Sequence, residues 1–113
     1  MAIRYFISLP DPAAARASGQ FAFRSQGAGG MAEELQDALR GEGLFERWRA
    51  GQEDPDAVDP ALGATDPDAR VDGEQRDLRF DLMVTTSLPG SVFKHRMRLL
   101  AGSAWELRDV AAA

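Results

Sequence analysis

The segment from Arg76 to Val110 alternates between apolar and polar positions with the two-residue period of β-strands. Its first run has Leu78, Phe80, Leu82 and Val84 on one face. The second run, residues 92–100, has Phe93, His95, Met97 and Leu99 on one face and Lys94, Arg96 and Arg98 on the other. The third run, residues 104–110, adds Trp105 and Leu107. The pattern therefore predicts a C-terminal three-strand meander with one buried face.

The requirement for a common apolar face also predicts how these strands pair. An even-numbered loop containing Pro89 and Gly90 joins the first two strands, and a loop of about three residues around Gly102 joins the last two. This pairing places Asp81 opposite Arg98 on the outer face and Asp109 beside His95 on the inner face.

The N-terminal half alternates first with strand period and then with helical period. Residues 3–9 read as a strand that ends at Pro10, and residues 20–25 read as a second strand, with one turn of helix between them at 13–17. A helix begins near Met31, after a glycine-rich break, and a shorter helix carries an apolar stripe from Leu44 to Trp48. These helices are expected to cover one face of the sheet.

Residues 51–75 show no periodicity and are longer than an ordinary loop. Between Glu53 and Glu74 lie eight acids and one base, so the segment carries about −7 while the rest of the chain is slightly basic. Two Asp-Pro-Asp repeats, beginning at Asp54 and Asp66, are typical of turns. The segment that begins at Asp66 does not match the EF-hand calcium loop, because Arg70 occupies a position that requires an oxygen ligand.

Length and composition predict one domain, residues 1–113, with 51–75 as an acidic, Asp/Pro-rich connecting segment. The chain has no cysteine, which excludes disulfides and thiolate sites. It has no apolar run of membrane-spanning length and no signal-peptide core, so a cytoplasmic location is expected. The bias toward Ala, Arg, Gly and Asp is typical of GC-rich bacterial genomes. The expected fold is α+β, with two layers: a mainly antiparallel sheet covered on one face by one or two helices.

Few residues are candidates for catalysis or for ligand binding. His95 and Asp109 would form a dyad in which the carboxylate orients the imidazole. This dyad would lie in a pocket between helices and sheet, with Thr86 and Tyr5 nearby. A lone histidine on an apolar strand face is more commonly a core residue, and no nucleophile elbow accompanies it. The glycine-rich segment 25–30 lacks the ending of a phosphate-binding P-loop.

These patterns favour a non-catalytic protein-interaction module, such as an adaptor, a regulator or an immunity-type protein, without cofactor or metal. The candidate partner-binding residues are the acids Asp54, Asp56, Asp59, Asp66, Asp68 and Asp72 and the bases Lys94, Arg96 and Arg98. Nucleic acid is not an expected partner, because the chain is acidic and its bases lack interleaved aromatic residues. The alternative is a small-ligand-binding or enzymatic domain that uses the pocket around His95.

Overall fold

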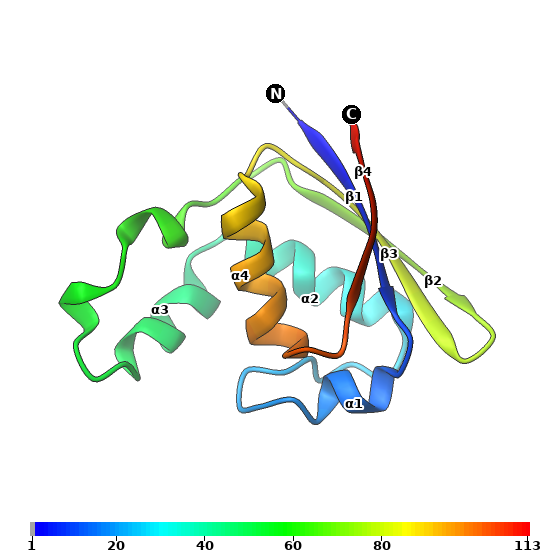
Figure 1. The fold of residues 1–113 in the computed structure, drawn as a ribbon, viewed down its shortest axis with the longest axis horizontal. Coiled ribbons are helices and arrows are strands. Elements are labelled where there is room, and N and C mark those ends of the chain that lie inside the picture. Colours follow the sequence, from blue (N-terminus) through cyan, green and yellow to red (C-terminus); the bar gives the residue numbers. More distant parts are fainter. Residues whose placement is uncertain (1) are drawn as a thin grey trace.

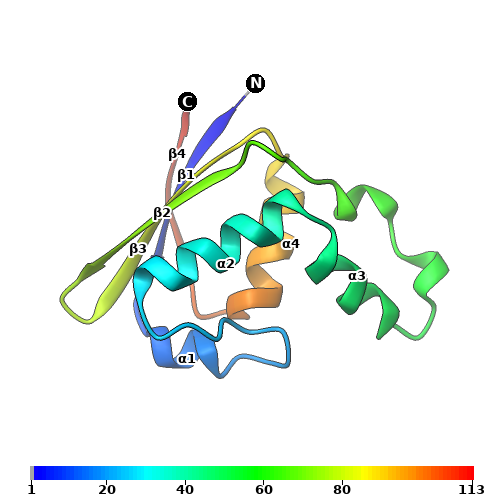
Figure 2. The ribbon, with the colours of Figure 1, turned by 180° about the vertical axis from the view of Figure 1, so that it is seen from behind.

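The computed structural model describes residues 2–113 as a two-layer α+β fold (Figures 1 and 2). One layer is a four-stranded sheet of β1 (Ile3–Leu9), β2 (Arg70–Arg76), β3 (Arg79–Thr86) and β4 (Glu106–Ala112). Every neighbouring pair is antiparallel, in the order β2-β3-β1-β4. The other layer contains α2 (Ala28–Arg40) and α4 (Gly90–Ala101) on one face of the sheet. The predicted fold class is confirmed.

The chain order and the strand order together define the topology. The main elements run strand, helix, strand, strand, helix, strand, and β4 lies beside β1, which is the ferredoxin-like or split βαβ arrangement. The first crossover is enlarged by α3 (Gly43–Ala50) and by two short 3₁₀ turns, η1 (Pro55–Ala57) and η2 (Pro60–Gly63). A short helix, α1 (Pro12–Arg16), follows β1 and confirms the turn of helix predicted there. Figure 1 shows the α3–η2 part extending away from the sheet.

The prediction of a strand at residues 92–100 is wrong, because this segment is helix α4. Phe93 and Met97 fit both patterns, but the helix buries them together with Val92, Arg96 and Leu100 rather than with His95 and Leu99. Strand alternation and helical spacing select overlapping positions over so short a run. The meander therefore does not exist, and β4 pairs with β1, with Asp109 in register with Phe6. The predicted contacts of Asp81 with Arg98 and of Asp109 with His95 are wrong for the same reason.

Three other boundaries differ from the prediction. Residues 20–25 form no strand; Phe23 instead lies in the core, and its N–H donates to the carbonyl of Leu100 at 2.9 Å. The end of the acidic segment is strand β2, and Leu78 lies in the β2–β3 turn with 87% of its surface exposed. Gly73 of β2 faces α2 so closely that a Cβ there would overlap the Ala28 carbonyl.

The core lies between the sheet and the two main helices. Tyr5, Ile7 and Leu9 of β1 and Phe80, Leu82 and Val84 of β3 form its sheet side, as the alternation predicted. The helix side consists of Met31, Leu35 and Leu39 from α2 and Phe93 and Met97 from α4. No described element covers the opposite face of the sheet, which we call the open face (Figures 1 and 2).

Candidate binding surfaces

The acidic segment is tied into the fold by Asp66. Its carboxylate is buried and accepts hydrogen bonds from the Thr86 hydroxyl at 2.8 Å, the Ser87 N–H at 2.9 Å and the Asp68 N–H at 3.0 Å. Burial by itself raises the pKa of Asp66, but these hydrogen bonds outweigh it and lower the pKa overall. Asp66 thus joins the acidic segment to the end of β3.

The other acids of the segment are dispersed. Asp59 caps η2 by accepting the Ala61 N–H at 2.9 Å, and Asp56 lies 3.4 Å from the Arg49 guanidinium. Asp54 and Asp68 are exposed. Asp72 belongs to β2, whose register places it directly across from Met83 on the open face. The six aspartates therefore form no single surface.

The three predicted bases are likewise separated. Lys94 and Arg98 are exposed on α4, whereas Arg96 is fully buried. Its guanidinium donates to the carbonyl oxygens of Ala38 at 3.1 Å, Leu62 at 3.0 Å and Ala64 at 2.8 Å. Burial lowers the pKa of Arg96. Arg96 joins α4 to the end of α2 and to η2, a role that its place in a charged alternating run did not reveal.

The residues of the predicted pocket occupy different environments. Tyr5 stacks on Phe93 with ring centroids 4.2 Å apart, and burial raises the pKa of its hydroxyl. His95 lies edge-on to Trp48 at 4.4 Å, and its pKa is lowered by burial and by the charges of Arg96 and Arg98. Thr86 is engaged by Asp66, and Asp109 is exposed on β4. These groups do not converge on a common cavity.

The open face carries a hollow of about 590 Å³. Phe6 of β1 and Met83 of β3 pair in register in its lining, and both are half-buried. Six charged residues also line the hollow: Asp72, Glu74, Arg76, Arg79, Asp81 and Arg108. The alternation of β1 and β3 places Phe6 and Met83 opposite the core, but only the observed pairing of these strands brings them together.

Several of these charges neutralise one another. Arg76 and Arg79 each lie 3.2 Å from the Asp81 carboxylate, and Arg76 lies at the same distance from Glu74. Arg108 pairs with Glu106 at 3.1 Å. In the cross-strand row that contains Phe6 and Met83, the flanking residues are Asp72 and Asp109. Neither of these two acids is in a salt bridge with any residue from 2 to 113.

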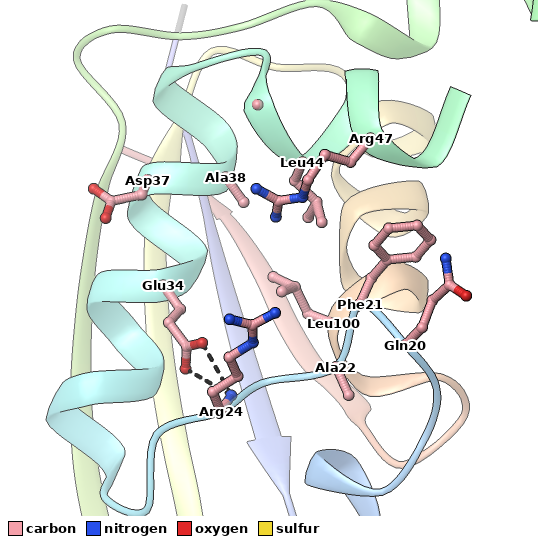
Figure 3. A pocket seen from close by; sticks show the side chains of 11 residues that line it. Gln20, Phe21, Ala22, Arg24, Glu34, Asp37, Ala38, Leu44, Arg47 and Leu100 are labelled. Carbon is pink, nitrogen blue, oxygen red and sulfur yellow. Dashed lines mark hydrogen bonds between the residues drawn. The ribbon is translucent and has the colours of Figure 1, made fainter. Parts of the chain in front are cut away.

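A second hollow, of about 420 Å³, lies on the helix side of the molecule (Figure 3). Its walls come from α2, α3, the end of α4 and the segment before α2. The guanidinium groups of Arg24 and Arg47 point into it above the apolar side chains of Phe21, Leu44 and Leu100. No sequence pattern indicated this site, because its residues are spread from position 20 to position 100.

No group of three or more potential metal-binding side chains occurs within residues 2–113. None of the described helices combines the length and hydropathy needed to cross a bilayer. No family model matches the chain, and neither curated proteins nor solved structures provide a match. Functional interpretation therefore depends on the surfaces themselves.

Proposed function

We propose that this protein is a non-catalytic protein-interaction module that binds its partner on the open face of the sheet. The observation that carries the proposal is the half-buried pair of Phe6 and Met83 at the centre of an otherwise charged face. An apolar centre with a polar rim is the usual anatomy of a protein interface, and aromatic residues, methionine and arginine are enriched there.

The charges around this pair indicate the chemistry of the partner. Arg76, Arg79 and Arg108 are paired with Glu74, Asp81 and Glu106. Asp72 and Asp109 beside the apolar pair, and Arg4 and Arg70 in the next cross-strand row, are in no salt bridge in the part of the chain described. A partner segment with an apolar side chain between two basic side chains complements this row. A nucleic acid backbone would instead be repelled by the two free carboxylates.

The alternative function, a catalytic or ligand pocket around His95, has less support. Tyr5 stacks on Phe93, the Thr86 hydroxyl donates to Asp66, and His95 packs edge-on to Trp48. These side chains therefore lie in separate environments and do not face one common site. Bacterial origin and a cytoplasmic location remain parts of the proposal that rest on the sequence pattern alone.

Affinity capture from extracts of the source cells tests the proposal with matched variants. Met83→Lys places a charge at the centre of the open face, opposite Asp72, whereas Ser91→Lys adds the same charge at an exposed position of α4. Equal thermal melts would establish that both variants fold. We expect the wild type and Ser91→Lys to retain the same protein and Met83→Lys to lose it.

A second pair of variants tests the role of charge. Asp72→Asn should weaken capture and reduce its salt dependence, because exposed charges are screened over about 8 Å at physiological ionic strength. Asp68→Asn removes an exposed acid that lies outside the open face and should have no effect. Capture that is the same for all four variants and the wild type would refute the proposed surface.

A further inference from the structure

The hollow on the helix side is a site independent of the open face, because helices of the other layer form it (Figure 3). We infer that it binds a small organic carboxylate with an apolar, ring-sized body. Its volume of about 420 Å³ lies within the usual range of ligand pockets, roughly 300 to 1,000 Å³. The site combines two positive groups with an apolar wall, and each part selects one part of such a ligand.

The positive part consists of Arg24 and Arg47. Their guanidinium groups enter the hollow from opposite sides, and neither is in a salt bridge with any residue from 2 to 113. A guanidinium presents its donors as a planar fork, which matches the two oxygens of a carboxylate. Two such groups that face one hollow favour an anion between them.

Two acids, Glu34 and Asp37, also line the hollow, and neither is in a salt bridge with Arg24 or Arg47 in the part of the chain described. Glu34 accepts the Arg24 N–H at 3.0 Å and the Ser25 N–H at 3.0 Å, so its carboxylate is held by the backbone. Asp37 points away from the hollow in Figure 3. Gly43, at the first turn of α3, also lines the site, and Glu42 makes no side-chain cap to that turn.

The apolar part selects the body of the ligand. The half-buried ring of Phe21 lies beside Leu44 and Leu100, both of which are buried. A flat hydrocarbon ring against the exposed part of Phe21 would remove apolar surface from water while its carboxylate meets the arginines. A bare inorganic anion gains only the second interaction, so the site should prefer the amphipathic compound.

Titration of the ¹⁵N-labelled protein with 2-naphthoate tests this inference. We expect saturable amide shifts at millimolar concentrations or below, centred on Arg24, Gly43 and Leu44. Neutral 2-naphthamide tests the need for charge, and inorganic phosphate tests the need for the apolar body. Both compounds should bind at least about tenfold more weakly, the factor expected when one charge-assisted interaction or a comparable apolar contact is lost.

Matched arginine variants complete the experiment. Arg24→Gln and Arg47→Gln should each weaken 2-naphthoate binding about two- to fivefold, the factor expected for an exposed ion pair. Arg98→Gln removes an exposed arginine that does not line the hollow and should bind like the wild type. Absence of saturable shifts, shifts centred elsewhere, or equal binding by all three variants would overturn the inference. The open-face proposal would be unaffected, because its residues are different.

Discussion

Arg96→Met is expected to lower the free energy of unfolding by about 3 kcal/mol. Methionine fills much of the same space but cannot donate the three hydrogen bonds that the guanidinium makes. The Ala38 bond is buried, and losing a charge-assisted bond there costs about 1.5–3 kcal/mol. The carbonyls of Leu62 and Ala64 are only partly buried, so water can replace those bonds at an added cost of about 1 kcal/mol.

Urea unfolding followed by the fluorescence of Trp48 and Trp105 measures this loss. Arg98→Met is the matched control, because Arg98 is exposed two positions along the same helix, and it should change stability by less than about 0.5 kcal/mol. Hydrogen exchange should also accelerate in residues 60–66 of the Arg96 variant, since that segment loses its attachment to α4.

An Arg96→Met variant as stable as the wild type would refute this reasoning. It would mean that the cost of burying the guanidinium, which is in no salt bridge with residues 2–113, cancels its hydrogen bonds. An equal loss in Arg98→Met would instead trace the effect to the helix itself.

Three further predictions follow from buried groups. Asp66→Asn should cost about 1–3 kcal/mol at pH 7. Since the folded pKa of Asp66 is lowered, this difference should begin to shrink below about pH 4 and vanish as the pH falls through the folded pKa, which urea melts across pH would measure. His95 has a lowered pKa in the folded state, so wild-type stability should fall as pH drops through about 6.5. His95→Gln should cost about 1–2 kcal/mol at neutral pH and reduce this dependence of stability on pH. Leu82→Asp should unfold the domain, whereas Met83→Asp should cost under about 1 kcal/mol, mainly from repulsion by Asp72; thermal melts in the reverse order would contradict the β3 register.

The sequence predicted a secondary-structure element correctly where only one period, that of a strand or that of a helix, fits its apolar positions. Only strand alternation fits β3, with Phe80, Leu82 and Val84 on one side, and the helical stripe of α2 was equally clear. In α4 only Phe93 and Met97 satisfy both periods, and tertiary packing decides between them. Strand β2 has one large buried side chain, Val71. Because its other residues are mostly charged, the sequence pattern did not separate this strand from the acidic segment.

The candidate sites were less predictable, because they depend on contacts between distant segments. Arg96 could be recognised as a core residue only once Ala38, Leu62 and Ala64 were seen to offer their carbonyls to one point. The Phe6 and Met83 pair similarly requires the β1–β3 register, which linear alternation does not specify.

Site-specific photocrosslinking in the source cells tests most directly whether the open face binds a partner. A benzophenone amino acid at position 6 replaces the aromatic ring at the centre of that face, and the same group at position 91 reports on the exposed surface of α4. The account predicts a discrete crosslinked protein from position 6 only, lost when Met83→Lys is added. Equal crosslinking from position 91, or none from position 6, would contradict it.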